Sequence, residues 1–303
     1  MHRAGLCIAL LAFALALATP AAALASGAPS VRVYRVAQSL TLDEGQSGEF
    51  TLACRAGDVV TDGTWRVESV DSNRQIDDES FDLVSGVDVL QAEAFSRQAY
   101  RFAVRNNAEG DAALQLAVSC LRGSVGDRKV VVRERREVTA KLAAGTASTL
   151  PAVACPAGTV AIASGLRIEG GGAGRLLGRM PALPGLERST LTVLGLDDVT
   201  VVASARCLHR ETSGHGGRRF SLRLAFRAGD AHVEAGHAAS FTVGCRARES
   251  AIAGGFTLSA AWYIGQTTTR RQRAFRVQAT ADGAGSARLG LLCLGEQAAT
   301  SRR

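Results

Sequence analysis

Hydrophobic and polar residues alternate along much of the chain with a period of two. In residues 114–120, LQLAVSC, every second position is leucine, leucine, valine or cysteine, and residues 220–226, FSLRLAF, repeat the pattern. This spacing is typical of a β-strand with one buried face. Helical spacing is largely missing, and frequent glycines interrupt the alternation as turns do. We therefore predict an all-β, antiparallel chain, with residues 91–102 as the one stretch that also fits a short helix.

The alternating segments recur three times along the chain. Each copy contains two cysteines, the first of them in FTLACRAG, PAVACPAG or FTVGCRAR. Ten positions after this cysteine stands Thr64, Gly165 or Gly255, followed by a large apolar residue, and a leucine follows the second cysteine of each copy. Self-similarity at roughly 90–100 residues indicates tandem domains rather than a short-period solenoid. We predict three tandem antiparallel β-sandwich-like modules. Their boundaries are residues 26–122, 123–212 and 213–303.

The six cysteines of these modules are all in phase with the buried face of their strands. A buried thiol has a raised pKa and is a poor nucleophile. Zinc requires four closely spaced ligands, and the sequence has no CxxC or HxxxH pair. Two buried cysteines in each module therefore predict one internal disulfide per module. The predicted disulfides are Cys54–Cys120, Cys155–Cys207 and Cys245–Cys293.

The N-terminus has the three parts of a secretory signal peptide. Arg3 precedes an apolar run over residues 4–19, and Ala23-Leu24-Ala25 forms an A-x-A cleavage site. The run is too short for a membrane span, and no later stretch reaches about 18 apolar residues. We expect a signal peptide at residues 1–25, cleavage before Ser26, and a secreted or periplasmic protein without a transmembrane segment.

The net charge of +7 is unevenly distributed along the chain. Residues 26–122 carry 9 basic and 15 acidic residues, residues 123–212 carry 12 and 8, and residues 213–303 carry 13 and 5. An acidic first module and a basic third module predict either head-to-tail self-association or binding of the basic end to an anionic surface polymer. Nucleic acid is the less favoured partner, and drift in surface charge is the alternative to both.

No catalytic or metal-binding motif is found in the sequence. It has no G-x-S-x-G elbow, P-loop, H-E-x-x-H or Rossmann fingerprint. Residues 77–82, DDESFD, lack the spacing of a calcium loop and are predicted to be a solvated loop. Residues 209–219, HRETSGHGGRR, are predicted to be a linker, with a metal or catalytic site as the alternative. We therefore expect no enzyme activity, no cofactor and no metal.

One candidate ligand site lies in the third module. Trp262 and Tyr263 have no counterpart in the other modules, and an exposed Trp-Tyr pair is suited to binding a ligand or a sugar. The alternative is that they pack under a loop. Nearby basic residues complete this candidate site: Arg270, Arg271 and Arg273.

Three functions follow, in order of preference. The first is a non-enzymatic binding or assembly protein of the cell envelope or the cell exterior, such as an adhesin, an appendage or a matrix component. The second is a ligand- or glycan-binding protein with its site in the third module. The third is an exported hydrolase. The three copies share structural positions but no polar ones, and this disfavours catalysis, which needs one convergent polar constellation.

Overall fold

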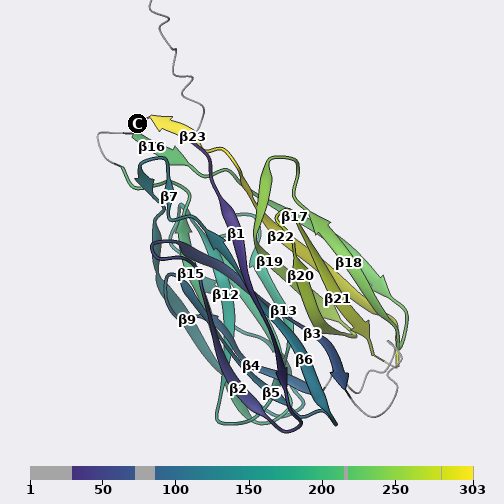
Figure 1. Cartoon of the computed structure of the whole chain (residues 1–303). Helices are drawn as coiled ribbons and strands as arrows, with labels where there is room; N and C mark the ends of the chain where they lie inside the picture. The colour runs from purple at the N-terminus through teal and green to yellow at the C-terminus, as the bar shows by residue number, and fades with distance from the viewer. Residues whose placement is uncertain (1–28, 72–85, 215–217, 281, 303) are drawn as a thin grey trace, which may run out of the picture.

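The described part of the chain is built from antiparallel β-strands (Figure 1). The computed structural model describes residues 29–71, 86–214, 218–280 and 282–302, and within these ranges there is no helix. The prediction of an all-β chain is therefore confirmed. The expected signal peptide, its cleavage site and the acidic loop at residues 77–82 lie outside the described residues.

We call residues 26–122, 123–212 and 213–303 the first, second and third segments; these boundaries remain a prediction. The first contributes β1 (Val33–Leu42), β2 (Ser47–Ala53), β3 (Val59–Asp71), β4 (Val87–Ala94), β5 (Ala99–Asn106) and β6 (Asp111–Leu121). The second contributes β9 (Val132–Leu142), β10 (Ala147–Thr149), β11 (Val153–Ala154), β12 (Thr159–Glu169), β13 (Gly174–Ala182), β14 (Arg188–Gly195) and β15 (Val199–His209). The third contributes β17 (Leu224–Val233), β18 (Ala238–Gly244), β19 (Glu249–Ser259), β20 (Ala261–Thr268), β21 (Gln272–Ala279) and β22 (Gly285–Gly295).

Short strands occupy the connections between the segments and the C-terminus. They are β7 (Ser124–Val125), β8 (Arg128–Lys129), β16 (Arg218–Ser221) and β23 (Ala299–Arg302). Residues 91–102, which also fitted a short helix, instead form the end of β4, a tight connection and the start of β5. The pairing of Ala92 with Phe102 across this hairpin supplies the backbone hydrogen bonds that a helix would have made internally.

Each of the three large sheets combines strands from two segments. The strand orders are β1-β6-β3-β20-β21-β18, β2-β5-β4-β12-β15-β9 and β10-β14-β13-β19-β22-β17, with β11 also pairing with β14. The segments thus do not form separate sheets, as three self-contained modules would. Each segment instead pairs one strand with each of its two neighbours, so the three segments close a ring. The ladder at each junction covers only one or two residue pairs, so it satisfies part of the backbone groups that would be unpaired if β3, β12 and β19 were edge strands.

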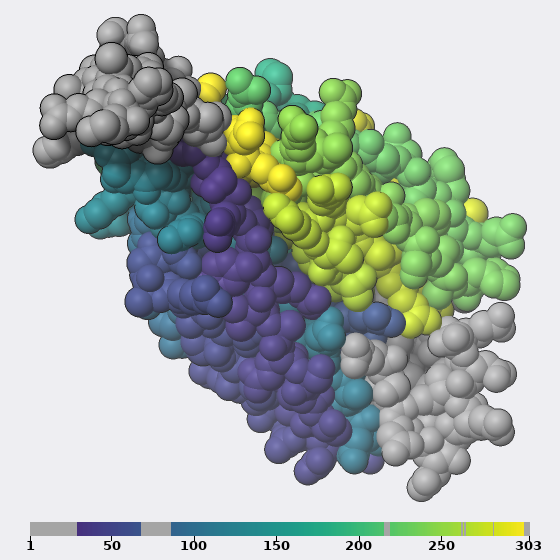
Figure 2. All heavy atoms as spheres, turned by 45° about the horizontal axis from the view of Figure 1, so that its top comes forward, coloured from purple at the N-terminus to yellow at the C-terminus, as the bar shows by residue number. Residues whose placement is uncertain are grey.

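The two ends of the described chain meet in this arrangement. Figure 2 shows the start of the first segment, in purple, beside the third segment, in yellow and green. The backbone nitrogen of Val31 donates to the carbonyl of Glu296 at 2.8 Å, and Ser30 forms an isolated bridge with Gln297. The ring is therefore closed by contacts between residues about as far apart in the sequence as the described chain allows.

Small residues mark the places where strands of two segments meet. A Cβ atom on Gly165 of β12 would lie 2.4 Å from the carbonyl oxygen of Ala92 on β4. A Cβ on Gly255 of β19 would lie 2.3 Å from the carbonyl oxygen of Arg179 on β13. The third junction, between β3 and β20, has Thr64 at the equivalent position of β3. At this junction the glycine is Gly265, which lies on the partner strand β20 and pairs with Arg66 of β3.

Replacement of Gly165 by valine is expected to lower the free energy of unfolding by about 1–3 kcal/mol. The obstacle is the backbone of β4, including the Cα of Glu93 at 2.6 Å, so no side chain can rotate away. Urea denaturation of the purified protein measures the effect. Gly283→Val is the matched control, because a Cβ at Gly283 meets no atom within 4 Å. Equal destabilisation by the two substitutions would show that the junction tolerates a side chain.

The structure contains the three expected disulfides, Cys54–Cys120, Cys155–Cys207 and Cys245–Cys293. Five of the six cysteines are in the main apolar cluster, and Cys245 packs against it half-buried. The leucine after each second cysteine faces the other way, into a second apolar cluster to which all three segments contribute. These leucines are Leu121, Leu208 and Leu294. The ends of β6, β15 and β22 are therefore buried on both faces, which explains why a leucine recurs at a position where alternation alone predicts a polar residue.

Candidate functional site

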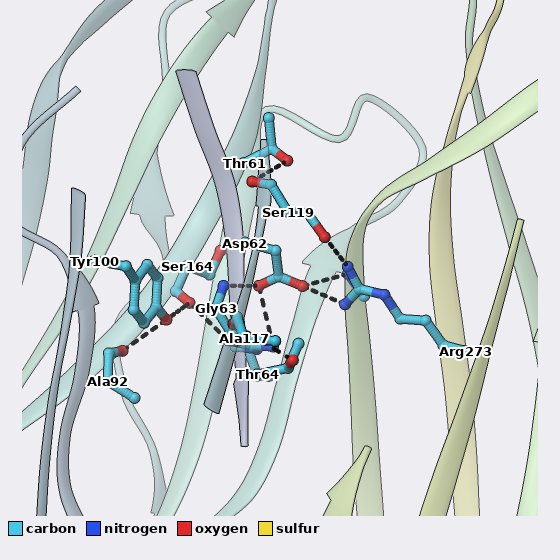
Figure 3. Close-up of polar contacts among 12 residues, drawn as sticks. Thr61, Asp62, Gly63, Thr64, Ala92, Tyr100, Ala117, Ser119, Ser164 and Arg273 are labelled. Atoms are coloured by element: carbon cyan, nitrogen blue, oxygen red, sulfur yellow. Dashed lines mark hydrogen bonds and ion pairs between the residues drawn. The ribbon is translucent and has the colours of Figure 1, made fainter. Parts of the chain in front are cut away.

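A buried ion-pair cluster joins the three segments. Asp62 on β3, Arg179 on β13 and Arg273 on β21 are 1%, 2% and 0% exposed. One oxygen of Asp62 lies 3.2 Å from Nη2 of Arg179, and the other is bonded to Nη1 of Arg273. Figure 3 shows the carboxylate of Asp62 pointing toward Arg273, with Ser119 beside the guanidinium. One carboxylate thus pairs with two guanidiniums, each from a different segment.

Glycines make room for the large polar side chains of this cluster. A Cβ on Gly63 would lie 2.2 Å from the ring of Tyr100, and a Cβ on Gly254 would lie 2.4 Å from Nη1 of Arg273. The backbone nitrogen of Gly254 donates to Asp62 at 3.0 Å. The cluster is therefore packed tightly, and among the described residues Nε of Arg179 and Nε of Arg273 are buried without a hydrogen-bond partner.

Two tyrosine hydroxyls lie close to the cluster. Burial raises the pKa of both Tyr100 and Tyr263, so both hydroxyls stay protonated. The hydroxyl of Tyr100 donates to the carbonyl of Ala92 at 2.8 Å. A reacting group would need access to solvent or substrate, and Asp62, Arg179, Arg273 and Tyr100 are buried. The cluster is suited to holding the three segments in one arrangement.

The structure does not bring the predicted ligand residues of the third segment to one site. Tyr263 stacks on Phe256, with ring centroids 4.2 Å apart, and meets the edge of Trp65 at 5.2 Å. Arg273 is the buried partner of Asp62. Both residues therefore face the interior.

The other residues of that predicted site lie elsewhere or are not described. Arg270 is exposed and forms an ion pair with Glu296 at 2.8 Å. Arg271 is also exposed. The side chain of Trp262 lies outside the described residues. Arg270 is the member of the predicted set that lines a hollow in the surface.

One group of potential metal ligands in the structure, and the linker that the sequence offered as an alternative metal or catalytic site, are engaged in other contacts. Cys245, Glu249 and Cys293 have ligand atoms within 4.8 Å of one another, but the two sulfurs are joined as a disulfide. Glu249 accepts two hydrogen bonds from Nη2 of Arg227, at 2.7 and 2.8 Å. In the linker, His209 accepts a hydrogen bond from Arg133 at 3.0 Å, and residues 215–217 lie outside the described residues.

A cationic groove lies at one end of the first segment. It consists of two adjoining hollows of about 780 and 580 Å³, which share Ala56, Asp58 and Arg122 as lining residues. Six cationic side chains line them, against the single carboxylate of Asp58. The six are Arg32, Arg55, Arg97, Arg122, Lys129 and Arg270.

Most of these cations are not neutralised by the protein. Among the described residues, only Arg270 of the six forms an ion pair with a carboxylate. Arg97 donates to the carbonyl of Val130 at 3.0 Å, and the guanidinium of Arg55 lies 5.3 Å from the ring centroid of Tyr34. The groove therefore presents positive charge that is available to an anionic ligand.

Asp58 is held rigidly in the middle of the groove. The hydroxyl of Tyr34 donates to one carboxylate oxygen at 2.7 Å, and the backbone nitrogen of Gly123 donates to the other at 2.8 Å. The same hydroxyl accepts from the backbone nitrogen of Arg55 at 2.8 Å. The carboxylate thus fastens the β2–β3 turn to β1 and to the connection after β6.

Sequence reasoning missed this groove because four of its six cations lie on the segment with the negative net charge, and the other two, Lys129 and Arg270, come from the other two segments. Charge counted along a segment does not report which face or end of the fold carries it. One signal was available in the sequence. Arg55 directly follows Cys54, and Arg122 follows Cys120 by two positions, so the predicted disulfide already implied that the two arginines lie near each other.

A scan against protein-family models and a search of curated proteins found no match to this sequence.

Proposed function

We propose that the protein is a non-enzymatic binding protein of the cell envelope or the cell exterior, and that it binds an anionic polymer through the cationic groove. The observation that carries the proposal is the set of six cations around one carboxylate, with a single cation neutralised by an ion pair among the described residues. A ligand that neutralises several of them releases counterions and gains from each contact.

The shape of the groove favours a polymer over a small ligand. Its two hollows adjoin and are open, and its cations come from the residue before β1, from three connections between strands, from the residue after β6 and from β8. Small-molecule sites are usually enclosed and mostly apolar. An extended anion can cross both hollows and combine several modest contacts into useful affinity.

The setting of the protein supports an external role. Three disulfides point to an oxidising, extracellular or periplasmic environment. None of the described residues forms a helix of the length and apolarity needed to cross a membrane. We further propose that residues 1–25 are removed as a signal peptide, and that the three segments are repeats of one β-sandwich-like unit with one disulfide each.

The charge asymmetry between the segments also has an internal use. The acidic first segment and the basic third segment share a sheet through β3 and β20, and Asp62 pairs with Arg273 between them. Attraction between the two ends therefore acts within one chain. This internal attraction weakens the argument from charge for head-to-tail self-association. Sedimentation of the protein at low and high salt would reveal such self-association if it occurs.

The double substitution Arg55→Glu and Arg122→Glu is expected to weaken binding of a polyanion at least thirty-fold, because two favourable charges in the groove become unfavourable. Isothermal titration calorimetry with polygalacturonate and with dextran sulfate measures the dissociation constants at low ionic strength. The wild-type affinity should fall as salt is added, since exposed charges are screened.

The matched control replaces two exposed arginines outside the groove, Arg223 and Arg288, by glutamate. It makes the same change in net charge. It should retain binding within a few-fold. Equal loss in both double variants would mean that net charge, or the third segment, binds the polymer. Absence of polyanion binding by the wild-type protein would refute the proposed function.

A further inference from the structure

We propose that the anionic polymer is an acidic polysaccharide with free hydroxyl groups, and that Asp58 selects it against polymers of phosphate. This inference rests on the proposed function and names the ligand class of the same groove. It follows from the position, the fixation and the remaining hydrogen-bonding capacity of one carboxylate.

The position of Asp58 divides the groove into two cationic parts. Asp58 lines both hollows, as does Arg122. The first hollow has Arg32, Arg55 and Arg270 on its wall, and the second has Arg97 and Lys129. A polymer that crosses the groove therefore passes cations, then the junction that holds both Arg122 and Asp58, then cations again, and Asp58 is the one carboxylate among these lining residues.

The carboxylate is fixed by hydrogen bonds and cannot turn away from a ligand. Tyr34 holds one oxygen and the backbone of Gly123 holds the other. Burial raises the pKa of Tyr34, and its hydrogen bond to Asp58 adds to the effect, so the hydroxyl keeps the proton that it donates. The acceptor side of that hydroxyl is occupied by the backbone nitrogen of Arg55.

Each oxygen of Asp58 can accept a further hydrogen bond. An ionised carboxylate has about four lone-pair sites, and the protein uses two of them here. A sugar hydroxyl is a donor that fits this remaining capacity. An acid group of the same polysaccharide would then pair with cations in either hollow.

A polymer that has no free hydroxyl groups between its charged groups fits this order of charges poorly. Polyphosphate or single-stranded DNA has no such hydroxyl to donate to Asp58 and would bring an anion next to it, and like charges repel. Nucleic acid also gains much of its affinity from stacking of bases on aromatic side chains. Tyr34 is the one aromatic residue among the lining residues, and the guanidinium of Arg55 lies over its ring.

The experiment compares dissociation constants for polygalacturonate, dextran sulfate, polyphosphate and a thymidine oligonucleotide, by calorimetry at fixed ionic strength. The wild-type protein is expected to prefer the better acidic polysaccharide over polyphosphate by about tenfold or more. Asp58→Asn should reduce this preference by about tenfold, mainly because polyphosphate binds more tightly once the negative charge is removed. The two polysaccharides distinguish a carboxylate from a sulfate as the acid group, and a preference for either supports the proposal.

Two further variants make the result decisive. Asp58→Thr places at this position the residue that the second segment has there, Thr159, and should lose the preference in the same way. Asp111→Asn removes an exposed carboxylate outside the groove and should leave the preference unchanged. Unfolding midpoints confirm that each variant is folded.

The inference is overturned if the wild-type protein binds polyphosphate or the oligonucleotide as tightly as the polysaccharides, or if both Asp58 variants keep the wild-type preference. These outcomes leave the proposed function standing, because the groove still binds polyanions. Failure of the wild-type protein to bind any of the four polymers refutes both proposals.

Discussion

Replacing Asp62 by alanine is expected to destabilise the protein by about 3–5 kcal/mol. The substitution leaves the guanidiniums of Arg179 and Arg273 buried without their carboxylate, and breaking a buried pair by removing one partner is strongly destabilising. It also removes the acceptor for the backbone nitrogen of Gly254. Urea unfolding followed by circular dichroism gives the difference in free energy.

Two comparisons test the cause of this loss. Asp230→Ala removes an exposed carboxylate on β17 and should change stability by less than about 0.5 kcal/mol. Adding Arg179→Met and Arg273→Met to Asp62→Ala removes the unpaired charges, and this triple variant should be more stable than Asp62→Ala alone. If the triple variant is the less stable of the two, the buried charges are not the main cost of losing Asp62.

Removing one disulfide by the double substitution Cys155→Ala and Cys207→Ala should cost about 4 kcal/mol. The sequence separation of 52 residues closes a large loop, and the chain-entropy model gives this value for the unfolded state. Thermal and urea unfolding of the purified variant measure the loss. A decrease of less than about 1 kcal/mol would contradict this expectation.

The same experiment tests how the segments depend on one another. Each large sheet combines strands of two segments, so loss of the second disulfide should shift a single transition of the whole protein. Three independent modules would instead unfold separately, and only about a third of the signal would move. Removing Cys54–Cys120 in the same way provides the comparison, because its separation of 66 residues predicts a similar loss.

The local structure of this chain was readable from its sequence. Period-two alternation identified strands such as β6, because side chains of a strand point alternately to its two faces. The phase of the cysteines within those strands identified the buried face, and the recurrence of two cysteines per segment narrowed the pairings to the three that the structure contains.

The candidate sites were less accessible to such reasoning. Arg273 was placed with Arg270 and Arg271 because the three are close in the sequence. In the structure the side chains of Arg273 and Phe275 are both buried on β21. Arg270 and Arg271 lie in the exposed connection before β21. The groove residues range from Arg32 to Arg270, and no local pattern connects positions so far apart.

The sequence by itself determined the all-β class, the strands and the disulfide pairs, because these depend on contacts between neighbouring positions or on a repeated pattern. Only the tertiary structure decided which segments share a sheet, why Gly165 and Gly255 are small, and where the cations gather. Strand edges are chemically alike, so the choice of partner strand depends on how whole segments pack, and the ion pairs of Asp62 exist only after that choice is made.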